Sequence, residues 1–257
     1  MLLRKSGEPG RVVKHIAWLV LAAWAGEQSC IAFYAFYAYG DGWWIKLGHV
    51  PILVPLIWPM VILSARAVAR ELWPGATRGK MAFQLALIVI FDASLIEILA
   101  VKAGYWSWFE GGYFGVPLMG ILGWGCFAFM ASFSLDARGW RAWLAPATTL
   151  VGTHLLLLGL WWGGLRWTLR GDLGPLVLLA FGAGALIYAA AVWQVRRTRR
   201  LTQETLVGRL VATGLFLGLL VSLEHAGYWW THFGLVAIPY VLAFPFSRSP
   251  TPTTHAR

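Results

Sequence analysis

The sequence has few charged residues and very few cysteines for its length. Charged side chains make up 12% of the 257 residues and hydrophobic ones 59%, whereas soluble domains carry about 25% charged residues. This shortage argues against an ordinary soluble fold. Both cysteines, Cys30 and Cys126, fall within apolar runs, so the sequence predicts no disulfide framework.

Acidic residues are scarce as well, since 11 Asp and Glu stand against 21 Lys and Arg, for a net charge of +10. Nucleic-acid-binding proteins share such an excess. The positions of the charges therefore decide between a nucleic-acid-binding protein and a membrane protein. The basic residues gather at 4–14, 66–80, 138–141 and 196–209, always beside or between apolar runs. This pattern predicts membrane topology and no nucleic-acid partner.

Long apolar runs account for most of the chain. A hydrocarbon core of about 30 Å requires roughly 20 apolar residues per helix. The run after the basic amino-terminal residues is too long for a signal peptide, so it counts as the first span. We predict an all-α polytopic membrane bundle of seven or eight transmembrane helices, forming one domain over residues 1–257. The spans are 16–37, 47–67, 81–103, 117–135, 142–160, 175–195 and 206–227, with a shorter eighth run at 233–246.

The basic residues also predict an orientation, because Lys and Arg are enriched in cytoplasmic loops. Fifteen of them share the side of the amino terminus, and only Lys46, Lys102, Arg166 and Arg170 fall on the opposite side. We therefore expect a cytoplasmic amino terminus. The expected location is a cell membrane, specifically a prokaryotic cytoplasmic membrane.

Ionisable side chains interrupt four of the predicted spans. Each costs a few kcal/mol within the bilayer, which makes it a functional candidate. With a rise of about 1.5 Å per residue, all of them lie between the midplane and the outer half of the bilayer. If the helices pack together, these groups surround one pocket; the alternative is that they only join helices by hydrogen bonds. They are Glu27, Asp92, Glu97, His154, Glu224 and His225.

Asp92 and Glu97 are five residues apart, about 140° around a helix, so they cannot point the same way. One can face a pocket while the other binds a neighbouring helix. A carboxyl in an apolar pocket can hold a proton at neutral pH, as the protonation of an alkene requires. Since no HxxxH or HExxH spacing occurs, the sequence predicts no metal site.

Aromatic residues are abundant, with 17 tryptophans, most of them near predicted helix ends. An interfacial belt explains most of these rings, but Trp106 and Trp108 stand beside the polar residues of the third span. A short echo is also present, since Ala-Gly-Tyr-Trp occurs at 103–106 and again at 226–229. Four matched residues do not establish a duplication.

The third and fourth spans carry an ordered set of motifs. Asp92-x4-Glu97 is followed by Gly104-Tyr105-Trp106-Ser107-Trp108, Gly112-Tyr113-Phe114-Gly115-Val116-Pro117-Leu118 and Leu122-Gly123-Trp124. Upstream stand Glu27, a tyrosine-rich segment at 34–39, and Gly48-His49-Val50-Pro51. This arrangement resembles the carotenoid hydratase family of membrane proteins, and the resemblance covers the first four spans.

The resemblance implies that water adds to the terminal isoprene double bond of a long polyene, without a cofactor. Membrane lipids and other carotenoid-pathway enzymes are candidate partners. Our hypothesis makes Asp92 or Glu97 the acid, with Glu27 and Glu224 holding water. The expected substrate-binding residues are Trp106, Trp108, Tyr113, Tyr34, His225, Trp124 and His154.

Two other functions fit the same residues. The acid could start the cyclisation of a terpenoid, because hydration and cyclisation both begin with a carbocation. Carboxylates near the midplane also serve proton-coupled transporters. Transporters usually repeat whole groups of helices, and the sequence shows only the short echo.

Overall fold

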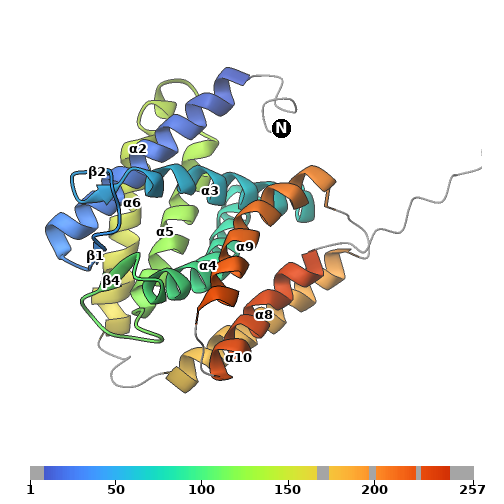
Figure 1. Cartoon of the computed structure of the whole chain (residues 1–257). Coiled ribbons are helices and arrows are strands. Elements are labelled where there is room, and N and C mark those ends of the chain that lie inside the picture. Colours follow the sequence, from blue (N-terminus) through green and yellow to red (C-terminus); the bar gives the residue numbers. More distant parts are fainter. Residues whose placement is uncertain (1–8, 167–173, 197–200, 224–226, 244–257) are drawn as a thin grey trace, which may run out of the picture.

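The computed structural model describes residues 9–166, 174–196, 201–223 and 227–243, and these form a bundle of helices (Figure 1). Two pairs of very short strands lie between the first four helices. The helices are α2 (Pro9–Tyr34), α3 (Leu53–Leu72), α4 (Arg78–Lys102), α5 (Leu118–Leu135), α6 (Ala145–Leu160), α8 (Gly174–Arg196), α9 (Gln203–Ser222) and α10 (Gly227–Ala243).

Helix α4 lies at the centre of the bundle. It packs against α3, α5, α9 and α10, and most of its residues are buried. The sequence explains this position, because α4 is apolar on all sides and a helix of that kind is buried all round. Around it, α6 packs against α2 and α5, while α8 pairs with α10.

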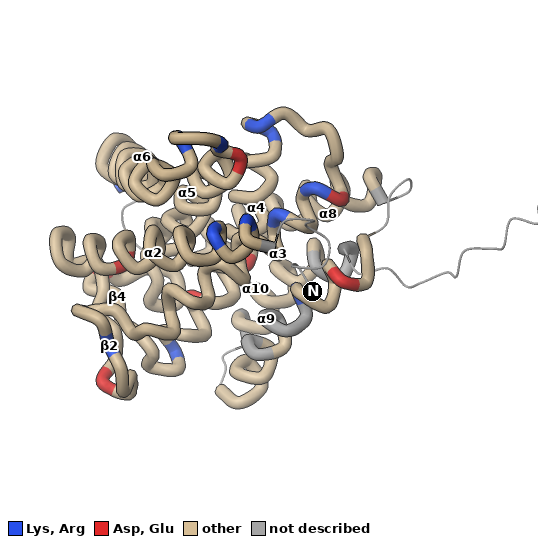
Figure 2. The backbone as a smooth tube through the Cα atoms, turned by 90° about the horizontal axis from the view of Figure 1, so that it is seen from above, with Lys and Arg blue, Asp and Glu red and all other residues tan. Residues whose placement is uncertain are grey.

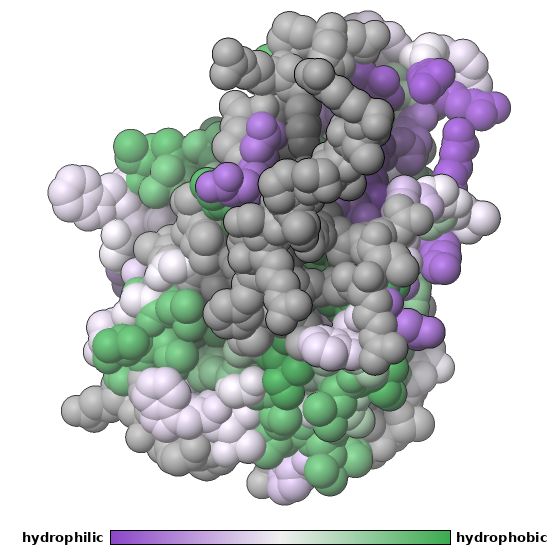
Figure 3. All heavy atoms as spheres, turned by 90° about the vertical axis from the view of Figure 1, so that its right-hand side faces the viewer, coloured by the Kyte–Doolittle hydropathy of each residue, from purple (hydrophilic) through white to green (hydrophobic). Residues whose placement is uncertain are grey.

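The described helices are those of a membrane protein. Six of them (α2, α3, α4, α5, α8, and α6 with its continuation to Leu165) are long and apolar enough to cross a bilayer. In the view of Figure 3, hydrophilic side chains gather toward one end and hydrophobic ones cover much of the other. The all-α membrane bundle is therefore confirmed, whereas the total of seven or eight spans and the cytoplasmic amino terminus stay predictions.

Basic side chains also gather in space. Figure 2 shows Lys and Arg where α2, α3, α4 and the turn between α5 and α6 lie next to one another. In this region Arg66 forms an ion pair with Asp136, and Arg70 lies 3.6 Å from the same carboxylate. These contacts join one of the basic stretches, 66–80, to the residue that follows α5.

Some helix boundaries differ from the predicted spans. Residues Lys46–Leu47 (β2) pair with Val50–Pro51 (β3) around Gly48, whose φ of +64° suits a tight turn. Helix α3 thus begins at Leu53 instead of residue 47, because this hairpin occupies the preceding residues. The predicted span 206–227 is also wrong at its end, since α9 stops at Ser222 and α10 starts at Gly227.

A second pair of strands positions the site. Residues Tyr37–Tyr39 (β1) and Trp106–Trp108 (β4) pair antiparallel, with Tyr37 opposite Trp108 and Tyr39 opposite Trp106. Gly104, at φ +74°, ends α4, and the amide of Tyr105 donates to the carbonyl of Ala100 at 2.9 Å. This C-terminal glycine motif turns the chain back so that β4 lies over the end of α4.

Candidate active site

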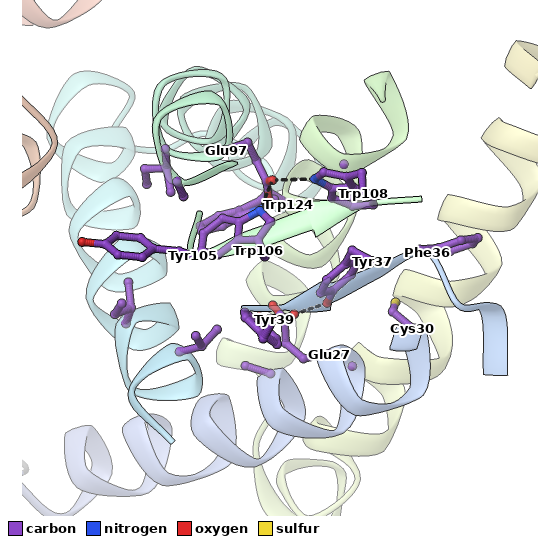
Figure 4. A pocket seen from close by; sticks show the side chains of 18 of the residues that line it. Glu27, Cys30, Phe36, Tyr37, Tyr39, Glu97, Tyr105, Trp106, Trp108 and Trp124 are labelled. Atoms are coloured by element: carbon purple, nitrogen blue, oxygen red, sulfur yellow. Dashed lines mark hydrogen bonds between the residues drawn. The ribbon is translucent and has the colours of Figure 1, made fainter. Parts of the chain in front are cut away.

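A cavity of about 550 Å³ lies beneath the β1–β4 ribbon. Residues of α2, α3, α4 and α5 form its walls, and residues of α6 and α9 complete it. Most of the lining is apolar or aromatic, and two carboxyl groups, Glu27 and Glu97, belong to it. Figure 4 shows the two acids with their aromatic partners on opposite sides of the cavity. Among the described residues that line it, none is Lys or Arg.

Three indole groups hold Glu97. Its Oε2 accepts hydrogen bonds from Nε1 of Trp106 at 2.8 Å and of Trp108 at 3.1 Å. Its Oε1 accepts one from Nε1 of Trp124 at 2.6 Å. Because an indole N–H only donates, all three bonds suit the lone pairs of the carboxyl group, and one position on Oε1 remains for a proton.

Glu27 is held in the same manner, with two phenols in place of two indoles. Its Oε2 accepts hydrogen bonds from the hydroxyls of Tyr37 and Tyr39, the latter at 2.8 Å, and its Oε1 accepts one from Nε1 of Trp58 at 3.0 Å. Burial, followed by the neighbouring Glu27 carboxyl, raises the pKa of Tyr37 and of Tyr39 well above its usual value. Both phenols therefore keep their protons and donate.

Ring contacts connect the two acid sites. Trp58 and Trp124 stack with their centroids 4.2 Å apart and their planes at 30°, and each donates to a different acid. Across the ribbon, Tyr37 lies 4.8 Å from Trp108, and Tyr39 lies 5.9 Å from Trp106. The result is a continuous aromatic wall with both carboxyl groups set into it.

These similarities reveal an internal repeat. In α2-β1-α3, an acid is followed by Tyr-x-Tyr, then by Val-Pro, then by Trp58 seven residues after Pro51. In α4-β4-α5, an acid is followed by Trp-x-Trp, then by Val-Pro, then by Trp124 seven residues after Pro117. The strands of the two units pair antiparallel with each other. The helix contacts correspond as well, since α6 packs on α2 and α5, and α9 packs on the equivalent helices α4 and α3.

The echo noticed in the sequence is not this repeat. Gly104 ends a helix, whereas Gly227 begins one, so the two Ala-Gly-Tyr-Trp segments occupy unlike places. The repeat escaped notice because the aromatic types differ between the units, and because few residues besides the acids, the Val-Pro pairs and the tryptophans are identical. A repeat of whole helix pairs therefore exists, contrary to what the sequence suggested.

Several predicted site residues meet at the cavity. Glu27, Glu97, Trp106, Trp108, Trp124 and His154 all line it. His154, from α6, lies 2.8 Å through Nε2 from the hydroxyl of Ser29. The cavity thus brings together residues from three of the four spans in which the sequence pointed to ionisable groups.

Asp92 does not line the cavity. Its Oδ1 and Oδ2 accept hydrogen bonds from the Arg209 guanidinium of α9, at 2.5 and 2.8 Å, and both side chains are buried. The reason is helical geometry, since five residues place Asp92 on a different face of α4 from Glu97. Asp92 is thus the acid that binds a neighbouring helix.

The remaining predicted residues lie elsewhere. The Tyr113 hydroxyl is 3.2 Å from Nδ1 of the buried His232 of α10, so its loop docks on α10 instead of the cavity. The ring of Tyr34 contacts Phe36 and His154 but does not line the cavity itself. Glu224 and His225 lie outside the described residues.

Sequence reasoning missed three partners of the acids, Tyr37, Tyr39 and Trp58. A signal existed for the tyrosines, because Tyr-x-Tyr and Trp-x-Trp both alternate with the period of a strand. Trp58 gave no such signal, since it stands in an apolar run among other belt candidates. His232 and Arg209 were also missed as buried polar groups.

The chemistry available to the site follows from these contacts. Two carboxyl groups face one apolar space, each with neutral donors only. A proton can pass from a carboxyl group to a bound alkene, and the donors then stabilise the carboxylate that remains. Aromatic faces around the space can stabilise a cation.

Comparison of the sequence with known proteins assigns the chain to a family. The family model described as carotenoid biosynthesis protein matches residues 8–170, which include both repeat units and α6. No curated protein and no solved structure matches the chain significantly. The matched segment carries both acids and all six of their aromatic donors. This membrane protein belongs to the carotenoid biosynthesis protein family.

Proposed function

We propose that the protein is a membrane-embedded hydratase that adds water to the terminal isoprene double bond of a carotenoid or related polyene. The observation that carries the proposal is the pair of glutamates, Glu27 and Glu97, set in one aromatic cavity with only neutral hydrogen-bond donors. The family description supports a role in carotenoid synthesis. The reaction class is our inference from the chemistry of the site.

Glu97 is the proton donor in this mechanism. Its Oε2 accepts two indole hydrogen bonds and its Oε1 accepts one, which leaves one position on Oε1 for the proton. The electron pair of the double bond takes that proton at the less substituted carbon, and a tertiary carbocation forms. The three indole N–H groups then stabilise the Glu97 carboxylate.

Glu27 completes the addition. A water molecule held by Oε1 of Glu27 attacks the cation and forms the new C–O bond, and Glu27 takes the proton that the water loses. The stacked Trp58 and Trp124 present aromatic faces to the cation, each such contact contributing about 0.5–2 kcal/mol when water is excluded. Return of the proton from Glu27 to Glu97 resets the site, and no electron is gained or lost, so the reaction requires no redox cofactor.

The setting of the cavity suits a substrate that stays in the bilayer. We propose that the amino terminus is cytoplasmic, that the protein resides in a prokaryotic cytoplasmic membrane, and that the polyene reaches the cavity from the lipid. Asp92 takes no part in the chemistry, because Arg209 occupies both of its oxygens. Roles for Glu224 and His225 stay predictions.

The test is the product formed in a polyene-producing host. Cells that express the protein should accumulate a tertiary alcohol heavier than the polyene by one water, and Glu97→Gln and Glu27→Gln should each abolish it. Glu110→Gln is the matched control, because Glu110 is a half-exposed acid that lies near Arg166 outside the cavity.

Three results would reject the proposal. A product of unchanged mass would indicate cyclisation instead. Full alcohol yield from both glutamine variants would remove the acid pair. If the purified protein moved protons across vesicles but converted no polyene, transport would replace catalysis.

A further inference from the structure

The two ends of the cavity differ in how they are closed. At the end near α3, α4 and α9, lining residues are exposed, with Leu53 at 56% and Tyr105 at 40%. At the end near α6, the described lining residues are buried or half-buried. There the Tyr34 ring stacks on Phe36 at 5.0 Å and contacts His154 at 5.5 Å. Figure 4 shows Tyr105 and Phe36 at opposite sides of the site, with both acids between them.

The repeat lets the two ends be compared residue by residue. Each residue immediately before an acid lines the cavity, and these are Gly26 in one unit and Ile96 in the other. Each residue immediately before a stacked tryptophan also lines it, and these are Ile57 and Gly123. Gly26 and Gly123 belong to the helices that pack on α6, and lie near Leu150 and Leu157 of that helix. The two isoleucines belong to α3 and α4, the helices that pack on α9. The helices at the closed end therefore carry no side chain at the positions where those at the open end carry isoleucine.

Packing does not require glycine at either place. A Cβ at Gly26 would lie 3.8 Å from Leu150, and one at Gly123 would lie 3.8 Å from Leu157, which are ordinary contacts. Gly120 differs, because a Cβ there would overlap the Trp108 ring. Glycine disfavours a helix relative to most residues, so two helical glycines without a packing reason point to a use for the space they leave.

We propose that Gly26 and Gly123 form a deep end of the cavity, which takes the two methyl groups that end the polyene beyond the reacting double bond. This proposal rests on the proposed hydratase function. A conjugated polyene is stiff, so the depth of the closed end sets how far the chain advances past Glu27 and Glu97. The two glycines therefore determine which double bond meets the acids.

The repeat also supplies the substitutions that test this. Gly26→Ile and Gly123→Ile each install the counterpart side chain from the other unit. Gly159→Ile is the control, because Gly159 is an exposed helical glycine of α6 that does not line the cavity. Alcohol yield per folded protein and the position of the hydroxyl group are measured by mass spectrometry and NMR.

We expect each isoleucine variant to lower hydration at the native carbon about tenfold, with unreacted polyene or a positional isomer in its place, and the control to match the wild type. Gly26→Ala and Gly123→Ala add one carbon each and should lower it about threefold, which keeps the test valid if an isoleucine variant does not fold. Wild-type yield and position in all four variants would overturn this proposal alone. A wild-type protein that forms no alcohol would instead remove the hydratase function.

Discussion

Helix α4 carries two buried acids in two different settings. Glu97 faces the cavity and accepts hydrogen bonds from three neutral indoles. Asp92, five residues earlier, is held by both arms of the Arg209 guanidinium. The two residues lie on the same helix and are both buried. They differ in their hydrogen-bond partners, not in their burial.

The contrast supports the different roles that we propose for the two acids. A guanidinium cancels the charge of Asp92 and occupies both oxygens, so the pair can act as a structural link between α4 and α9. Neutral donors orient Glu97 without supplying a permanent positive charge, so its carboxyl group can gain and lose a proton. Glu27 has the same kind of surroundings, which places it with Glu97 and apart from Asp92.

The sharpest separation should come from removing the acid function of Glu97. In Glu97→Gln, the side chain keeps its size but cannot donate the proton, so hydration should fall about 100-fold to 10,000-fold, the range typical of general acid catalysis. Alcohol yield per folded protein in a polyene-producing host measures this, with folding checked by gel filtration in detergent. Retention of more than half the wild-type yield would place Glu97 outside the reaction.

The opposite behaviour is expected for the Asp92 pair. Arg209→Met leaves a buried charge without its partner, which costs about 3–5 kcal/mol of unfolding free energy. Asp92→Leu combined with Arg209→Met removes both charges and should recover most of that loss. Unfolding in mixed detergent measures the stability. If the double variant were stable but made no alcohol, Asp92 would have a role in the chemistry after all.

The same residues show which features of the fold and the site could be predicted from the sequence. The apolar runs predicted the helices because a bilayer fixes their length and composition, and the five-residue spacing predicted that Asp92 and Glu97 diverge. Which of the two faces the cavity depends on where α9 docks, and no local pattern reports that. Arg209 stood in a basic stretch expected at the cytoplasmic surface, yet its side chain is only 7% exposed.

The repeat shows a second limit of sequence reasoning. The two units preserve the number of hydrogen-bond donors but not the residue types, since Tyr37 and Tyr39 in one unit take the places of Trp106 and Trp108 in the other. Identity is low even though the contacts correspond. The chain turn at β1 was hidden as well, because Tyr37 continues an apolar run and was assigned to the first span.

A smaller effect is expected from removing one donor to Glu97. Trp106→Phe and Trp108→Phe each keep a ring in the wall but delete one N–H, and a hydrogen bond to a charged group contributes about 1.5–3 kcal/mol. Hydration should therefore fall about tenfold or more in each variant. Trp43→Phe is the control, because Trp43 donates to the backbone carbonyl of Tyr105 in the same region. Equal loss in all three would show that the rings matter and the donors do not.

The smallest effect should come from the phenols that hold Glu27. Tyr39→Phe deletes a 2.8 Å hydrogen bond to Glu27. In our mechanism Glu27 takes up a proton and loses its charge, whereas Glu97 gains one, so a smaller loss of about 1 kcal/mol, several-fold in rate, is expected. Tyr188→Phe is the control, since its ring packs on Phe91 away from the cavity.

The pH dependence tests the same contact in the unmodified protein. A phenol donates below its pKa and loses the proton above it, and burial raises the pKa of Tyr37 and Tyr39 in the folded state. Their hydrogen bonds should therefore persist up to at least about pH 10, the usual phenol value. Hydration by the purified protein in vesicles is measured across alkaline pH. The wild type and Tyr39→Phe should show the same pH profile up to about pH 10. A decline below that pH in wild type alone would mean that Tyr39 ionises, and the neutral-donor account of Glu27 would then fail.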